Sequence, residues 1–181
     1  MNTKTEELEL TKEIKKLIRD VYDFPKKGII FKDIMPFLGD YKVFKQTIDY
    51  LANYYRNKNI SKVIGIEARG FILAAPLALE IGAGFVPVRK KGKLPYKTIS
   101  VTYDLEYGKD TLEVHEDAIK SGENVIIVDD VLATGGTAKA VCDLVKRLGG
   151  NVSSVFMMIE LSGLNGREKL KDYDLFSLIK Y

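Results

Sequence analysis

Two adjacent carboxylates and a glycine-rich turn follow one another in the second half of the chain. Asp129 and Asp130 come directly after the β-branched run Val125–Val128, which is typical of a strand buried on both faces. Backbone N–H groups of a glycine turn that opens a helix, together with nearby hydroxyls, can bind a phosphate group. The residues of this turn are Ala133, Thr134, Gly135, Gly136 and Thr137.

The acid pair restricts the ligand that such a turn would accept. Two carboxylates repel a bare anion and are costly to bury unless hydroxyl groups or a metal ion satisfy them. A ribose 5-phosphate that carries a Mg²⁺-bound diphosphate meets these needs, with its phosphate in the turn and its ribose hydroxyls on the acids. No lysine follows the glycines, which argues against a nucleoside triphosphatase loop.

Apolar periodicity predicts the elements that position these groups. Helical spacing places Leu10, Ile14, Leu17, Ile18 and Val21 on one helix and Phe44, Ile48, Leu51 and Tyr55 on another. Further helices are expected to open at Gly70 and at Thr137. Short apolar runs predict strands at Lys62–Ile66, Phe85–Val88, Val125–Val128, Val152–Ile159 and Leu175–Ile179.

This alternation of strands and helices predicts an α/β fold with a doubly wound, mostly parallel, Rossmann-like sheet. Polar loops at residues 67–70, 89–93 and 129–137 follow three of the strands, so we expect them to meet at one edge of the sheet. Residues of about 90–110 alternate in polarity and predict a flexible hairpin, or flap.

Bulk properties favour one domain over residues 1–181 that binds small acidic molecules. A net charge of +3 is too small for a nucleic-acid-binding surface, and no apolar run is long enough to cross a bilayer. Cys142 is the single cysteine and is predicted to be a buried apolar residue. A reducing cytoplasm is the expected location, with neither nucleic acid nor membrane as a partner.

The run VIIVDDVLATGGT resembles the signature of the type I phosphoribosyltransferases, which use phosphoribosyl diphosphate (PRPP). Other segments, from about Asp23 onward, resemble the members of that family that act on adenine. They are Asp23–Pro25, Gly28–Ile34, Glu67–Phe71, Arg89–Pro95, Leu105–Gly108 and Gly166–Leu170, the last expected to be a short helix with Arg167, Glu168 and Lys169 facing solvent.

The resemblance implies a purine salvage enzyme that converts adenine and PRPP to AMP and diphosphate. It also implies that the enzyme uses Mg²⁺ as cofactor and forms a homodimer. It implies that the glycine turn holds the 5-phosphate and that Asp129 and Asp130 engage the ribose hydroxyls, directly or through metal-bound water. No direct protein ligand of the metal is assigned. Diphosphate-binding residues would be Arg69, Arg89, Lys90 and Lys93.

A base-binding segment within about residues 1–35 is also implied. Phe31 would stack on adenine, main-chain groups of Ile30 and Lys32 would read its polar edge, and Leu161 would close the far side. Lys32 departs from the arginine common in the family. This exchange matters little if the main chain makes the contact, and it lowers base affinity if a guanidinium plane is needed.

On the flap, Glu106 is the implied acid or base at the purine imidazole ring, with Tyr107 beside it. Glu106 either transfers a proton or only positions the flap, which would exclude water when closed. Two other functions remain open: transfer to a 6-oxo purine, and a noncatalytic regulator that senses PRPP.

Overall fold

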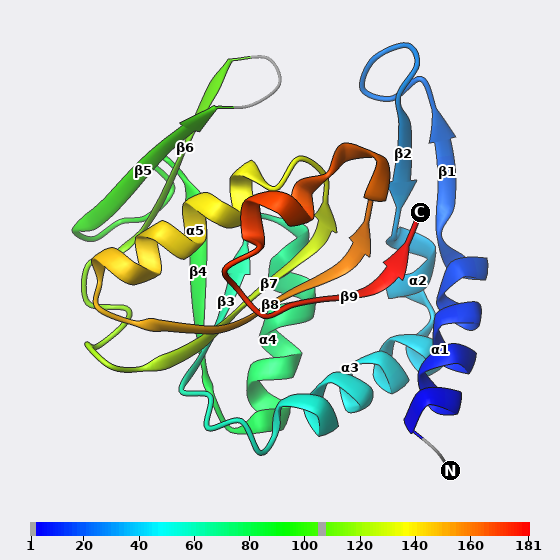
Figure 1. Ribbon diagram of the computed structural model, residues 1–181, viewed down its shortest axis with the longest axis horizontal. Helices are drawn as coiled ribbons and strands as arrows, with labels where there is room; N and C mark the ends of the chain where they lie inside the picture. Colours follow the sequence, from blue (N-terminus) through cyan, green and yellow to red (C-terminus); the bar gives the residue numbers. More distant parts are fainter. Residues whose placement is uncertain (1–2, 105–107) are drawn as a thin grey trace. The chain divides into compact units, whose positions relative to one another are not determined.

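The computed structural model describes residues 3–104 and 108–181 and has two units, Met1–Asn53 and Tyr54–Tyr181. The first unit contains helix α1 (Thr3–Leu17), strands β1 (Arg19–Tyr22) and β2 (Ile30–Asp33), helix α2 (Met35–Gly39) and most of helix α3 (Tyr41–Tyr55) (Figure 1). The expected apolar face of α1 is present, with Leu10 and Ile14 buried.

The prediction that this helix includes Ile18 and Val21 is wrong. Helix α1 ends at Leu17, and Val21 lies on β1, which pairs antiparallel with β2 and places Val21 opposite Phe31. The helical spacing of the apolar residues therefore continued past the end of the helix, into a strand whose partner lies farther along the chain.

The second unit is built on a seven-stranded sheet in the order β5-β6-β4-β3-β7-β8-β9 (Figure 1). Strands β4, β3, β7, β8 and β9 are parallel, and the β5–β6 hairpin joins β4 antiparallel at one edge. The strands are β3 (Lys62–Ile66), β4 (Gly84–Lys90), β5 (Thr98–Asp104), β6 (Lys109–His115), β7 (Asn124–Leu132), β8 (Asn151–Glu160) and β9 (Leu175–Lys180). The predicted mostly parallel sheet and its hairpin are confirmed.

Helices α4 (Arg69–Ile81) and α5 (Gly136–Arg147) cover opposite faces of this sheet. Successive strand residues point to opposite faces. Ile64 and Ile66 of β3 belong to the core under α5, whereas a Cβ at Gly65 between them would meet Ala74 of α4 at 3.0 Å. The sheet is therefore doubly wound, as predicted.

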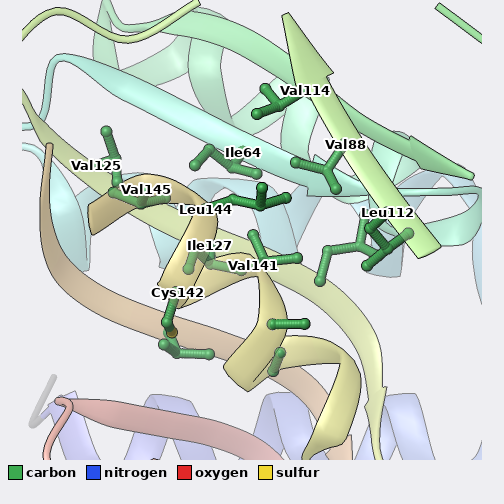
Figure 2. Close-up of a cluster of buried hydrophobic side chains, with 14 of the residues drawn as sticks. Ile64, Val88, Leu112, Val114, Val125, Ile127, Val141, Cys142, Leu144 and Val145 are labelled. Atoms are coloured by element: carbon green, nitrogen blue, oxygen red, sulfur yellow. The ribbon is translucent and has the colours of Figure 1, made fainter. Parts of the chain in front are cut away.

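Figure 2 shows the core under α5, where Val141, Leu144 and Val145 of the helix pack on Val125 and Ile127 of β7. Cys142 is fully buried in this cluster, and burial raises the pKa of its thiol to about 12. This thiol is therefore protonated and apolar at neutral pH, which confirms the predicted role of Cys142 as a packing residue.

Parallel strands place their carboxyl ends at one edge of the sheet. Strands β3, β4 and β7 accordingly bring the loops after Ile66 and Lys90 to the same edge as the end of β7. Among the helices within residues 3–104 and 108–181, none has the length and apolar character needed to span a bilayer.

Candidate functional site

Strand β7 carries both acids of the predicted site. It was expected to end at Val128, but it continues to Leu132, and Asp129 keeps its ladder pairing with Met157 of β8. The carboxylate of Asp129 accepts the backbone N–H of Asp130 at 2.9 Å, and Asp130 is 5% exposed. The acids are thus held on the sheet itself, with little freedom to move.

Burial raises the pKa of both carboxyls, and the neighbouring charge of Asp130 raises the pKa of Asp129 further. Arg69 acts in the opposite direction, because its Nε atom lies 2.7 Å from Oδ2 of Asp130. Two carboxyl groups with raised pKa values beside one guanidinium form a site that needs further positive charge or hydroxyl donors. Ribose hydroxyls would supply the donors, and a hydrated cation would supply the positive charge.

Gly70 allows Arg69 to come this close to the acids. A Cβ at Gly70 would lie 2.7 Å from the carbonyl oxygen of Val128 and 2.9 Å from Oδ1 of Asp129. Because no side chain fits there, the first turn of α4 packs directly on the end of β7, with Arg69 as the first residue of the helix. The start of α4 thus brings the Arg69 guanidinium beside Asp130.

The glycine turn forms the start of α5, one residue earlier than the expected Thr137. Gly135 has φ +78°, which glycine adopts without strain, and no side chain caps the helix. The first N–H groups of the helix therefore have no intrahelical partner and no side-chain acceptor at the cap. This is the amide arrangement that a phosphate requires.

A second glycine closes the back of this turn. A Cβ at Gly166 would overlap the carbonyl oxygen of Ala133, and a Cβ at Gly135 would overlap the carbonyl oxygen of Gly166. The 3-10 helix η2 (Gly166–Leu170) thus packs backbone to backbone on the turn. Sequence reasoning assigned no such role to Gly166, since its partner lies some thirty residues away.

The hairpin meets the turn at its other side. The Oγ1 of Thr137 donates a hydrogen bond to the hydroxyl of Tyr103 on β5 at 3.2 Å, and burial raises the pKa of Tyr103. A Cβ at Gly136 would lie 3.3 Å from the carbonyl oxygen of Asp104. The flap strand therefore touches the predicted phosphate site through Tyr103, to which the sequence analysis assigned no role.

The predicted diphosphate cations are partly engaged by acids of the protein. Arg89 lies on Glu67, with Nε 3.2 Å from Oε2, and donates to the carbonyl oxygen of Lys93 at 3.0 Å. Burial acts to raise the pKa of Glu67, but hydrogen bonds from the Lys90 N–H and from Arg89 outweigh it and lower that pKa. The Nζ atom of Lys90 lies 3.3 Å from Asp110.

The predicted adenine-binding residues fall in different units. In the first unit, Phe31 packs edge-on against Phe24, with ring centroids 5.2 Å apart, and Lys32 Nζ lies 2.7 Å from Asp20. Ile30 is exposed on β2, next to Phe31. In the second unit, Leu161 follows β8 and donates its N–H to the carbonyl oxygen of Leu132.

Glu106 and Tyr107 lie outside the described residues. Across the described part of the chain, no group of three or more His, Cys, Asp or Glu side chains forms a metal site.

Of the three residues of η2 that were expected to face solvent, Glu168 and Lys169 are exposed, whereas Arg167 is only partly so, with its side chain 39% exposed. Its guanidinium donates to both oxygens of Glu160, at 3.0 and 2.6 Å, and to the carbonyl oxygen of Leu175. Hydrogen bonds from Arg167 lower the pKa of Glu160, which is 5% exposed. The pair ties η2, and with it Gly166, to the ends of β8 and β9.

Comparison with known proteins gives consistent results. Residues 40–180 match the family model described as phosphoribosyl transferase domain. An adenine phosphoribosyltransferase of Clostridium kluyveri is 56% identical over 164 residues, which are 91% of this chain and 95% of the relative. These values leave little of either chain outside the match.

Solved structures show the same. A crystal structure of adenine phosphoribosyltransferase from Thermoanaerobacter pseudethanolicus superposes with a TM-score of 0.91 at 53% identity, over 94% of this chain and 99% of that one. The Saccharomyces cerevisiae enzyme, complexed with an imino-altritol bisphosphate and adenine, gives 0.89 at 40% identity over 94% and 99%. The chain belongs to the adenine phosphoribosyltransferase family.

Proposed function

We propose that the chain transfers the 5-phosphoribosyl group of PRPP to adenine, giving AMP and diphosphate. The observation that carries this is the pairing of an uncapped amide turn with two adjacent carboxylates, one buried and one half-buried, on the same strand–helix unit. Family membership and adenine-named relatives at 52–56% identity support adenine as the base.

In this reaction the bond between the anomeric carbon and the diphosphate oxygen breaks, and a bond from adenine N9 forms. The N9 proton leaves, and Glu106 is the proposed acceptor, with Tyr107 beside it. Positive charge develops at the anomeric carbon, and Asp129 and Asp130 would stabilise it while they hold the ribose hydroxyls. Their fixed position on β7 means that they need no reorganisation as the charge appears.

The 5-phosphate would bind to the N–H groups of residues 133–137 and to the two threonine hydroxyls. Arg69, at the start of α4, would hold the diphosphate, with Arg89, Lys90 and Lys93 adding charge from the next loop. Mg²⁺ would neutralise diphosphate charge and meet Asp129 and Asp130 through water. Phe31, Ile30, Lys32 and Leu161 remain the proposed adenine contacts.

The salt bridge from Lys32 to Asp20 supports one of the two open interpretations of Lys32. Its ammonium group is held on the neighbouring strand, which leaves the main chain as the proposed contact with the base. A homodimer in the cytoplasm is part of the same proposal, and the single buried cysteine is compatible with a reducing compartment.

The test is a steady-state assay of diphosphate release with PRPP, Mg²⁺ and a panel of adenine, guanine, hypoxanthine and xanthine. We expect adenine to be preferred by about 10⁴-fold, because a site that hydrogen-bonds the amino edge leaves buried groups unpaired with a 6-oxo purine. A preference for a 6-oxo base would reject adenine as the substrate. A folded protein that binds PRPP without turnover would point to a sensor.

A further inference from the structure

The turn that carries Lys93 is built around a carboxylate from another strand. Residues 91–94 lead from β4 toward β5, and Gly92 in this turn has φ +80°. Glu113 lies on β6, where the register places it opposite Arg89 of β4 and Ser100 of β5. It is 5% exposed, between the buried residues Leu112 and Val114.

One oxygen of Glu113 collects the amides of the turn. Oε1 accepts the N–H groups of Gly92 at 2.9 Å, Lys93 at 3.2 Å and Leu94 at 3.3 Å. Oε2 accepts the hydroxyl of Thr98 at 3.4 Å. Burying a carboxylate is costly without such donors, so the backbone of the turn and the side chain of Glu113 fix each other in place.

Glu67 holds the preceding residues in a similar way. It accepts the N–H of Lys90 at 2.9 Å and pairs with Arg89, which in turn donates to the carbonyl oxygen of Lys93. The cationic loop is thus fixed by two acids that bind its backbone N–H groups. The backbone N–H groups of Lys90 and Lys93 donate hydrogen bonds to these acids, while the residue Lys93 itself stays exposed.

We propose that Glu113 is a positioning residue for diphosphate recognition, acting through the turn of residues 91–94. The inference rests on the proposed function, since it takes the diphosphate of PRPP as the ligand of this loop. The physical basis is the length of the Glu113 side chain. It places one carboxylate oxygen within hydrogen-bond distance of three backbone amides, and these bonds fix the position of the backbone that carries the loop cations. A negative charge near a diphosphate gives no attraction of its own, so the charge of Glu113 is not what the ligand needs.

Two substitutions at Glu113 separate the effect of side-chain length from the effect of negative charge. Glu113→Asp keeps the charge but withdraws the carboxylate by one methylene, away from the three amides. Glu113→Gln keeps the length of the side chain and one acceptor oxygen but removes the charge. Its NH₂ group can donate to the hydroxyl of Thr98. Glu116→Asp is the matched control, because Glu116 is exposed just after the same strand.

We expect Glu113→Asp to raise the KM for PRPP about tenfold, as small displacements of binding groups do, while the KM for adenine stays within about twofold. Glu113→Gln and Glu116→Asp should stay within about threefold of the wild type for both substrates. Binding of Mg²⁺-diphosphate by calorimetry should follow the same order. A side chain that only stabilises the fold would shift the melting temperature and leave the KM for PRPP and the affinity for Mg²⁺-diphosphate unchanged.

Unchanged KM for PRPP in Glu113→Asp, or equal rises for both substrates, would overturn the inference while the wild type remains active. A wild type that neither turns over nor binds diphosphate would overturn the proposed function as well. Should Glu113→Asp not fold, Gly92→Ala replaces it, because its Cβ meets nothing within 4 Å and strains only the turn. The Gly92→Ala variant must then raise the KM for PRPP without raising the KM for adenine.

Discussion

Arg69 and Asp130 form an ion pair in which Nε lies 2.7 Å from Oδ2, at the point where α4 begins and β7 carries its acids. Both partners are proposed to bind ligand, Arg69 the diphosphate and Asp130 the ribose. The pair therefore joins two proposed subsites before any ligand is present. Arg69 also opposes the repulsion that Asp130 imposes on Asp129, because its positive charge lowers the pKa of Asp129 while the charge of Asp130 raises it.

Asp130→Asn should lower turnover about 10²–10³-fold, because it removes one preorganised charge from the reacting centre. The melting temperature should change much less, since the asparagine is nearly isosteric at a strand position. Turnover and thermal unfolding are measured on the same samples. Asp143→Asn, which removes a half-exposed acid paired with Lys139 on α5, is the control and should leave turnover intact. Parallel losses of stability and activity in Asp130→Asn would contradict this role.

Asp129→Asn should raise the melting temperature of the free protein at neutral pH. The pKa of Asp129 is raised well above its ordinary value of 3.8 by burial and by Asp130. The folded state then binds a proton more tightly than the unfolded state, so stability is present below about pH 4 and is lost as pH rises through the folded pKa. Because asparagine carries no charge, the variant does not lose this stability as the pH rises.

The melting temperature should rise by about 2–4 °C for each kcal/mol of unfolding free energy that is recovered in a chain of this size. This gain should be seen at pH 7 and vanish near pH 3.5, where the wild-type acid is protonated in both states. Differential scanning calorimetry at the two pH values measures it. A gain that is equal at both pH values would mean that the charge of Asp129 is not the cause.

Much of this fold was predictable because local signals agree with it. The run Val125–Val128 reads as a buried strand and is one, since parallel strands covered on both faces need continuous apolar residues. The extension of β7 through Asp129 and Asp130 was not predictable, because charged residues ordinarily end such a strand. The pairing of β7 with β8 overrides that preference.

The site was predictable in its residue types and less so in their surroundings. Glu113 sits in an alternating strand where a polar residue normally faces solvent, and no local signal marks it as buried. Its burial depends on amides contributed by residues 92–94, which lie nineteen or more positions away. Contacts of Gly166 with the glycine turn and of Arg167 with Glu160 are hidden for the same reason.

Tyr103→Phe should raise the KM for PRPP about 3- to 10-fold, the loss expected for one hydrogen bond worth roughly 1 kcal/mol. The missing hydroxyl is the hydrogen-bond partner of Thr137, whose side chain is proposed to bind the 5-phosphate. When Thr137 donates its one proton to the phosphate, the Tyr103 hydroxyl can donate to Thr137 Oγ1 in turn and hold that side chain in place. Substrate titrations at saturating adenine measure the change. Tyr96→Phe removes an exposed hydroxyl nearby and is expected to be silent. Equal KM values for the two variants would show that the link to Thr137 does not affect the phosphate.

Gly166→Ala should weaken PRPP binding more than any other single methyl group added behind the glycine turn. Its Cβ would overlap the carbonyl oxygen of Ala133, and backbone cannot yield as a flexible side chain does. The turn must therefore move, and its amides lose their alignment with the phosphate. Isothermal titration with ribose 5-phosphate reports this directly, without the base or the flap.

Gly163→Ala is the matched control, since a Cβ there meets nothing within 4 Å in the adjoining 3-10 helix η1 (Ser162–Leu164). We expect an affinity loss of about tenfold or more for Gly166→Ala, in line with a displacement of the binding amides, and no loss for Gly163→Ala. Retained affinity in Gly166→Ala would mean that the turn binds phosphate without support from η2. The Arg167–Glu160 pair would then serve stability alone.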